Sequence, residues 1–392
     1  MRRWMRYNST MMKITNFPKA AAGAVALAAV CAAGNAFAEV YGDPPDAMHA
    51  WAVHDWNRPK PHRVGFDAKG VPSDAVVLFD GTEKSYRENW VSSSGGAPKW
   101  KFADGAIAWV PGRRTGGLKT KAEFGDCQLH IEFRHPAGIK SKGGPQMRGN
   151  SGVFLMGADY GYEVQVLESH FTCEEMKGKP GYVDNYADGQ AGSVYGQNPP
   201  AVNPQKKPGE WQVYDIVFHQ PVFKDGKTVH PGSLTVFMNG VLVQDHWELE
   251  GQTEHKMRTK QRVHGPKGPL ALQNHGCEVE FRNIWLRPLP SRWANKTHSR
   301  MSADPAEVAK LRRETAAALY AKIANPDAFD AGTVKALAEV VSYSGEAVYR
   351  EKLLAAARKF DASKPSAADR KSVKAVLGVL SRSGTVPEGL VK

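Results

Sequence analysis

Short runs of alternating apolar and polar residues fill the chain between about Ala75 and Pro288, and they constrain its fold more than any other feature. Cys127–Phe133 and Trp211–Phe218 each place an apolar residue at every second position. A period of two is typical of a strand with one buried face. Long helical patterns do not separate these runs, so the sequence predicts an all-β domain, either a sandwich or a barrel.

One hairpin and two long loops are predicted within this domain. Leu234–Met238 and Val241–Val243 flank Asn239-Gly240, and Asn-Gly favours a two-residue turn because both of its residues take a positive φ. Lys140–Gly149 and Thr172–Gly209 do not fit strands, since they are rich in Gly, Pro and polar residues. Long loops in a compact domain are usually functional or mobile.

The pattern changes near residue 300. Ser302–Pro305 offers a helix cap and an early proline, and helical patterns follow at about 331–343, 346–360 and 366–381. We therefore expect a small C-terminal α-helical bundle over residues 300–392. It contains no motif with an assignable chemistry, so packing or docking is its default interpretation.

The N-terminus has the pattern of a signal peptide. A basic start is followed by an apolar run over Ala20–Ala33 and then by Ala36-Phe37-Ala38. The run is too short to span a membrane, although an uncleaved anchor stays an alternative. We expect residues 1–38 to be a signal peptide cut after Ala38, a periplasmic or secreted protein with no stable membrane anchor, and an extended lead-in over residues 39–74.

The net charge of the chain is +12, but part of this excess leaves with the basic signal peptide. The remaining basic residues are spread thinly, in pairs such as Arg113-Arg114, and no aromatic-interleaved basic block occurs. A nucleic-acid partner is therefore not expected.

Three cysteines remain after the signal peptide, and an odd number cannot pair completely within one chain. Cys127 and Cys277 share parity with apolar strand positions, which favours buried thiols. A Cys127–Cys277 disulfide is the open alternative.

Six short motifs occur in an order and spacing that resemble the 3-keto-disaccharide hydrolase domain family. They are Leu78–Thr82, Trp100–Ile107, Asn150–Phe154, Tyr162–Glu168, Gly268–Gly276 and Glu280–Trp285. The resemblance covers roughly residues 75–288 of a domain that we place at residues 75–290. It implies a concanavalin-like jelly-roll β-sandwich, found mostly in exported bacterial proteins, and cleavage of glycosides that carry a ketone at C3 of the sugar. The family favours Asp where this chain has Glu168, and Lys140–Gly149 is extended, so both features bear on substrate preference.

The acidic strand is the centre of the predicted site. Glu163, Gln165 and Leu167 share one face of a strand, and a carboxylate there is either part of a site or paired. Glu168 breaks the alternation, and a bulge near Leu167 would bring it onto the Glu163 face. In the alternative interpretation, the carboxylates pair with Arg148 or Arg282.

A 3-keto sugar needs a base, a donor for the leaving oxygen, and donors at the ketone oxygen. The ketone acidifies the C2–H bond, so removal of that proton expels the C1 substituent by β-elimination, and water then adds to the double bond. The predicted catalytic residues are Glu163, Glu168 and His275. The predicted substrate-binding residues are Asn150, Gln165, Gln273 and Arg282.

Cofactors and partners follow from what the motifs contain. Histidine and cysteine spacing does not indicate zinc, whereas a divalent metal at the ketone or a structural calcium stays open. There is no dinucleotide fingerprint, so a sugar 3-oxidising dehydrogenase of the same pathway would supply the ketone.

Two other functions stay open at this point. One is a non-catalytic carbohydrate-binding module, since this fold does not fix a function. The other is a conventional glycosidase with Glu163 and Glu168 as its carboxylate pair, which a retaining mechanism places about 5–5.5 Å apart. Gln165 stands where glucanases of the same fold carry a central Asp, and this argues against the glycosidase.

Overall fold

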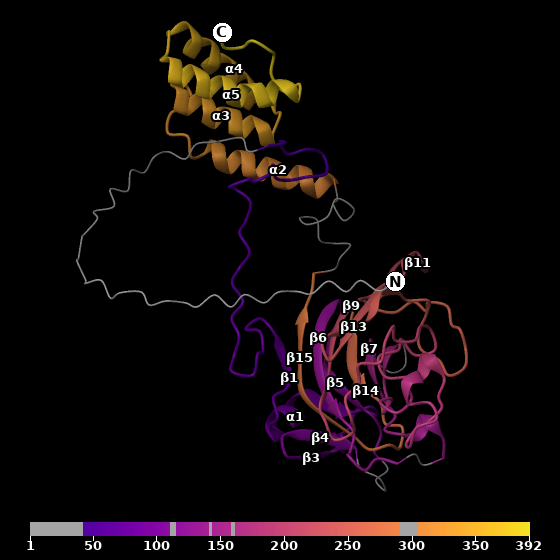
Figure 1. Cartoon of the computed structure of the whole chain (residues 1–392). Helices are drawn as coiled ribbons and strands as arrows, with labels where there is room; N and C mark the ends of the chain where they lie inside the picture. Colours follow the sequence, from indigo (N-terminus) through magenta and orange to yellow (C-terminus); the bar gives the residue numbers. More distant parts are fainter. Residues whose placement is uncertain (1–41, 110–114, 141–142, 158–160, 291–304) are drawn as a thin grey trace, which may run out of the picture. The chain divides into compact units, whose positions relative to one another are not determined.

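The structure, a computed structural model, describes residues 42–109, 115–140, 143–157, 161–290 and 305–392. These residues belong to two compact units, residues 42–315 and residues 316–392 (Figure 1). The predicted signal peptide and its cut after Ala38 lie outside the described residues, as does the Arg113-Arg114 pair.

In the described part of the first unit, strands form an eight-stranded and a five-stranded sheet, both antiparallel, and one two-stranded ribbon. The larger sheet contains β1 (Val76–Phe79), β3 (Lys101–Ala103), β4 (Ala106–Trp109), β6 (Cys127–Arg134), β9 (Gln212–His219), β12 (Ser233–Met238), β13 (Val241–Glu248) and β15 (Val279–Pro288). The smaller sheet contains β2 (Trp90–Ser92), β5 (Leu118–Phe124), β7 (Ser151–Leu155), β8 (Tyr162–Val166) and β14 (Gly268–Leu272). The ribbon pairs β10 (Val222–Lys224) with β11 (Lys227–His230). The prediction of a mostly β domain is confirmed.

One hydrophobic core joins the two sheets. Leu129, Ile131 and Phe133 of β6 are fully buried and belong to the same cluster as Tyr162 and Val164 of β8. Full burial of each such side chain stabilises the fold by roughly 1.5–3 kcal/mol. The sheets therefore pack face to face as a sandwich, and each keeps one face away from the core.

The predicted hairpin is confirmed, whereas one helix was missed. Asn239 and Gly240 connect β12 to β13 with φ values of 52° and 81°. Helix α1 (Glu83–Asn89) stands between β1 and β2, and its cap residue Thr82 accepts a hydrogen bond from the Ser85 backbone. At seven residues, this helix is too short to show a helical period in the sequence.

Loops cover the outer face of the smaller sheet beside β8. The loop after β8 carries the 3₁₀ turns η2 (Glu174–Met176) and η3 (Ala187–Gly189), and it forms a bridge between Val194 and Val164. A third turn, η1 (Pro145–Met147), precedes β7. As a result β8 is buried on both of its faces.

No disulfide joins Cys127 to Cys277. The Cys127 side chain faces the core opposite Pro288, whereas Cys277 precedes β15 and its thiol contacts the His275 carbonyl oxygen at 3.7 Å. The two cysteines lie at opposite ends of the β15 pairing, so the alternative of a disulfide is wrong. Burial also raises the pKa of the Cys127 thiol to about 12.

The second unit is helical. It contains α3 (Ala331–Tyr343), α4 (Ala347–Ala362) and α5 (Ala367–Arg382), and α2 (Pro305–Tyr320) runs across the boundary. Leu337, Leu353 and Leu380 are fully buried in a core of their own. The helices expected at the C-terminus are therefore present.

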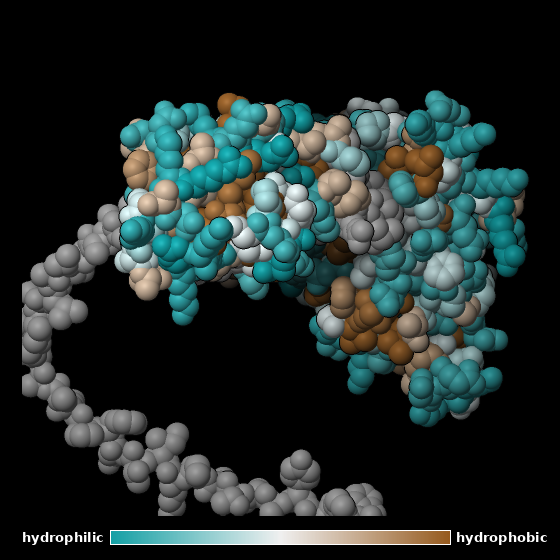
Figure 2. Space-filling model, turned by 90° about the horizontal axis from the view of Figure 1, so that it is seen from above, coloured by the Kyte–Doolittle hydropathy of each residue, from teal (hydrophilic) through white to brown (hydrophobic). Residues whose placement is uncertain are grey.

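The surface visible in Figure 2 is largely hydrophilic. Figure 2 shows polar residues over most of the visible face, interrupted by smaller hydrophobic patches. None of the helices in the described ranges is both long and apolar enough to cross a membrane.

Candidate active site

A cavity of about 620 Å³ opens on the face of the smaller sheet that points away from the core. Strands β7, β8 and the end of β14 contribute to it, together with the loops that cover this face. It is lined by Asn150, Phe154, Glu163, Gln165, Tyr195, Thr253, Glu254, His255, Arg262, Gln273 and His275. Five of the seven predicted site residues are therefore brought together, since Glu168 and Arg282 are absent from this lining.

Strand β8 places two polar side chains in the cavity because its faces alternate. Tyr162, Val164 and Val166 belong to the hydrophobic core, whereas Glu163 and Gln165 line the cavity. The regular pairing of β8 with β7 holds both in place, with Glu163 opposite Phe154 and Gln165 opposite Gly152. This agrees with the face assignment made from the sequence.

Glu163 is the most perturbed carboxyl group of the cavity. Its side chain is 3% exposed, and the described part of the chain offers its carboxyl group no hydrogen bond or ion pair. Burial disfavours the charged form and raises the pKa of Glu163 to about 8. The group therefore titrates near neutral pH, where it can exchange a proton with a bound molecule.

Gly152 provides the space for this carboxyl group. A Cβ at position 152 would overlap Glu163 Oε1 and would lie 2.8 Å from its Cδ. The glycine of the Asn-Ser-Gly motif is thus explained by the close approach of a side chain from the neighbouring strand.

Three amide side chains form a connected group beside Glu163. Asn150 Nδ2 donates to the carbonyl oxygen of Gln146 at 2.8 Å and to its Oε1 at 3.2 Å. Gln165 Nε2 donates to Asn150 Oδ1 at 3.3 Å and to Gln146 Oε1 at 3.4 Å. Gln146 was not predicted, because it lies in a loop without a recognisable motif.

Gln273 and His275 follow directly after β14. The Gln273 backbone donates to the Gly152 carbonyl oxygen at 3.0 Å, which fixes it beside Gly152. Its Oε1 is buried and has no hydrogen-bond partner among the described residues. His275 lines the cavity and is exposed to solvent.

Loop residues that the sequence analysis missed complete the rim. Tyr195 Oη lies 3.1 Å from His255 Nδ1 and 3.2 Å from the Tyr186 hydroxyl group. Thr253, Glu254 and Arg262 come from the segment between β13 and β14. The only signal for Tyr195 was the length of the loop after β8, which indicated a function and no particular residue.

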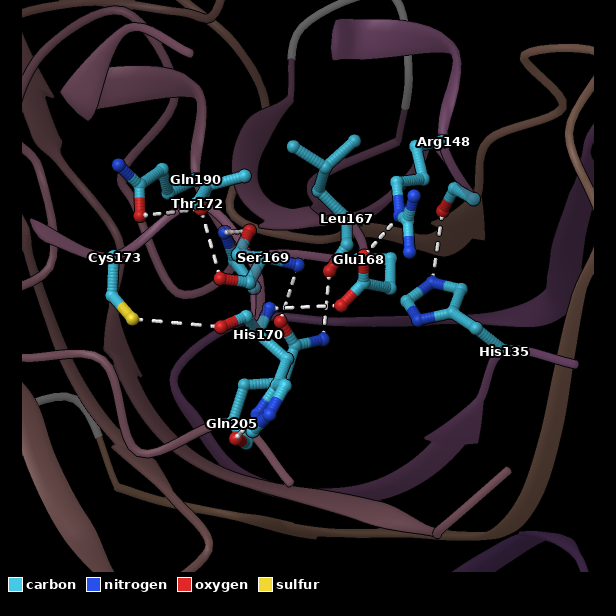
Figure 3. A network of polar contacts seen from close by, with 12 residues as sticks. His135, Arg148, Leu167, Glu168, Ser169, His170, Thr172, Cys173, Gln190 and Gln205 are labelled. Carbon is cyan, nitrogen blue, oxygen red and sulfur yellow. Dashed lines mark hydrogen bonds and ion pairs between the residues drawn. The ribbon is translucent and has the colours of Figure 1, made fainter. Parts of the chain in front are cut away.

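Glu168 lies outside the cavity, contrary to prediction. Its side chain is 1% exposed and forms an ion pair with Arg148, and its Oε1 accepts a hydrogen bond from the His170 backbone at 2.9 Å. Figure 3 shows Arg148 and Glu168 directed toward each other. The expected bulge is absent because β8 ends at Val166, two residues before Glu168.

Arg282 is also not part of the site. It lies on β15 of the larger sheet, on the opposite strand face from the core residue Phe281. Its Nε donates to Glu132 at 2.6 Å, and its guanidinium group lies 4.0 Å from the centre of the Trp211 ring. Arg282 therefore braces the larger sheet.

No three His, Cys, Asp or Glu side chains of the described ranges come together in a way that could hold a metal ion.

Residues 74–287, more than half of the chain, match the 3-keto-alpha-glucoside-1,2-lyase-like domain family. The chain belongs to this family. The matched residues include the acidic strand β8 and the segment that follows β14, so the family match spans every residue of the cavity. Carbohydrate processing by a hydrolase or lyase is thus the activity of this protein at the family level.

Several solved structures are similar to this chain. A candidate glycosyl hydrolase from Parabacteroides distasonis ATCC 8503 is 40% identical, with a TM-score of 0.52, and the match covers 62% of this chain and 98% of that chain. A second candidate glycosyl hydrolase from the same organism is 20% identical, with a TM-score of 0.39 and coverages of 55% and 94%. A carbohydrate-binding module from Bacillus subtilis is 12% identical, with a TM-score of 0.28 and coverages of 50% and 94%. No curated protein matches the chain.

Proposed function

We propose that this family member cleaves 3-keto glycosides, with Glu163 as the base that removes the proton at C2. The C1 substituent then leaves by β-elimination, and water adds to the double bond to give the free 3-keto sugar. The observation that carries the proposal is the Glu163 carboxyl group, which is buried in the cavity without an ion-pair partner among the described residues. A pKa near 8 makes this group a stronger base than an ordinary glutamate.

The size and polarity of the cavity support a sugar substrate. A volume of about 620 Å³ falls in the usual range for small-molecule sites. Asn150, Gln165 and Gln273 supply amide groups for hydroxyl recognition, and Phe154 supplies an apolar wall.

The geometry does not favour the two alternatives. A glycosidase pair of Glu163 and Glu168 loses its second member, because Arg148 holds Glu168 outside the cavity. A binding module needs no buried carboxyl group with a pKa near 8, since burial of such a group costs stability without adding contacts.

Three further parts of the proposal rest on the sequence and the family. We propose a concanavalin-like jelly-roll topology for the sandwich. We also propose export to the periplasm or the medium, on the signal-peptide pattern of residues 1–38. An upstream sugar 3-oxidising dehydrogenase would generate the ketone.

The test is incubation of the protein with a 3-keto disaccharide and with its parent sugar in D₂O, followed by mass spectrometry. We expect cleavage of the keto sugar only, with deuterium incorporated at C2. Glu163→Gln should lower the rate by roughly 10²–10⁴-fold, whereas Glu248→Gln, a matched change at an exposed carboxylate of β13, should not. Equal cleavage of the parent sugar would instead support a conventional glycosidase, and saturable binding without cleavage would support a binding module.

The pH dependence provides a second test. The carboxylate form of Glu163 acts as the base, so kcat/KM should rise about tenfold per pH unit below pH 8 and level off above it. The titratable and charged groups that share its cavity are Tyr195, Glu254, His255, Arg262 and His275. A profile that falls between pH 6 and 8 would show that protonated Glu163 acts as an acid instead.

A further inference from the structure

The amide groups of Asn150 and Gln165 have fixed orientations in the cavity, because Gln146 holds both of them. Gln146 Nε2 donates to the backbone carbonyl oxygen of Gly189 at 3.0 Å and to Asn185 Oδ1 at 3.1 Å. A carbonyl oxygen can only accept, so the Gln146 amide nitrogen must point at Gly189 and its Oε1 must point at Asn150 and Gln165. The Gln146 carbonyl oxygen fixes Asn150 in the same way.

The floor of the cavity therefore presents acceptors. Both amide hydrogens of Gln165 are used within the group, which leaves its Oε1 for a ligand. Gln273 Oε1 is unpartnered among the described residues. These oxygens suit sugar hydroxyl groups, which donate, and they cannot supply a proton to a departing oxygen.

The proton donor must then come from the rim, and Tyr195 is best placed to provide it. Its backbone donates to the Glu163 carbonyl oxygen at 3.1 Å. The acid and the base would therefore lie on two backbone segments that are joined by a hydrogen bond. The Tyr195 hydroxyl group is backed by His255 Nδ1 at 3.1 Å, and His255 is exposed to solvent.

We propose that Tyr195 is the acid that protonates the departing C1 oxygen, with His255 as the positioning residue that returns the proton. This inference rests on the proposed function. As the C1–O bond breaks, its electron pair goes to the oxygen, which takes the proton of Tyr195 Oη. The electron pair of the former C2–H bond forms the double bond between C1 and C2. His255 Nδ1–H then reprotonates the tyrosinate and regains its proton from solvent.

The surroundings of Tyr195 keep its hydroxyl group protonated. Burial, then the hydrogen bond with Tyr186, and more weakly the charge of Glu163 hold the pKa of Tyr195 well above its ordinary value. The hydroxyl group therefore stays protonated throughout the pH range in which Glu163 ionises, so both groups are in the required state at the same time.

The experiment compares two leaving groups on the same 3-keto glucoside, a second sugar and 4-nitrophenol, whose anion departs without protonation. Tyr195→Phe should lower kcat on the disaccharide by roughly 10²–10³-fold and change the nitrophenyl rate by only a few-fold. Deuterium exchange at C2 in D₂O should persist in this variant. His255→Gln should show the same leaving-group pattern with a smaller loss. Tyr182→Phe, a matched change at a half-buried tyrosine outside the cavity lining whose hydroxyl group donates to Asp184, should leave both rates unchanged.

Three outcomes would overturn the inference. Equal losses on both substrates together with loss of C2 exchange would give Tyr195 a purely structural role. Unchanged rates on both would assign the acid to another group, with His275 the next candidate. If the wild-type protein neither exchanges C2 nor cleaves the keto sugar, the proposed function itself fails, which the exchange measurement distinguishes from the first two.

Discussion

At the scale of single residues, Glu163 is held in an environment that does not suit its charge. The strand places it in the cavity, and Gly152 leaves room for its carboxyl group. The described residues supply no cation to compensate for burial, which raises the pKa of Glu163 to about 8. Such a group lowers the stability of the fold at any pH where it is ionised in the unfolded chain but protonated in the native one.

This cost leads to a prediction about stability. Below pH 4.5 Glu163 is protonated in both states, and above that pH the unfolded state ionises first, so wild-type stability falls up to about pH 8. Relative to Glu163→Gln, the wild type should therefore lose roughly 1.4 kcal/mol per pH unit between pH 5 and 8. Urea unfolding at several pH values measures this, and a constant difference between the two proteins would show that Glu163 has an ordinary pKa.

At the scale of elements, the strands were predictable and the covering loops were not. Alternation located β6 and β9 because one face of each strand is buried, and the Asn-Gly turn located β12 and β13. The same rule assigned Glu163 and Gln165 to one face of β8. It failed at Glu168, since parity has no meaning beyond the end of a strand at Val166.

Sequence reasoning could not place Arg282 outside the site, nor could it find Tyr195 and His255. Arg282 obeys strand parity, but parity cannot tell which sheet of a sandwich a strand joins, and β15 joins the larger one. Tyr195 and His255 come from two different loops, neither of which shows a period in the sequence, and only the folded chain brings Tyr195 Oη within 3.1 Å of His255 Nδ1.

The ion pair between Arg148 and Glu168 connects the loop before β7 to the end of β8. The Glu168 backbone also donates to the Arg148 carbonyl oxygen at 3.0 Å, so the loop that carries Gln146 and Asn150 is held at two points. Arg148→Ala would leave a buried carboxylate unpaired and should destabilise the protein by roughly 3–5 kcal/mol.

A double variant, Arg148→Met with Glu168→Leu, separates structure from catalysis. It removes both charges, so we expect thermal stability to return close to the wild-type value and cleavage of the keto sugar to be retained. Recovered stability with no activity would give Glu168 a role in the reaction after all.

At the scale of the whole molecule, the two units have separate hydrophobic cores. The core of the sandwich and that of the helices share no residue, and the cavity is built entirely within residues 150–275. Each core should therefore respond to its own mutations.

Calorimetry can test this independence. Leu337→Ala removes a fully buried side chain from the helical core and should lower the stability of that unit by roughly 2–5 kcal/mol. We expect one of two unfolding transitions to move to lower temperature while the other, and the cleavage rate, stay unchanged. A single transition that shifts as a whole would mean that the units unfold together.

The space beside Gly152 has a consequence for the history of this fold. One added methyl group at Gly152 would displace the carboxyl group of Glu163, whose atoms lie nearest to it. A homologue with alanine at this position would keep the amide groups that bind the sugar but would lose the carboxyl group that removes its C2 proton. Catalytic and sugar-binding proteins of this fold would then differ by a single carbon atom. The residue at the position of Gly152 is therefore the one to compare when the two kinds are told apart.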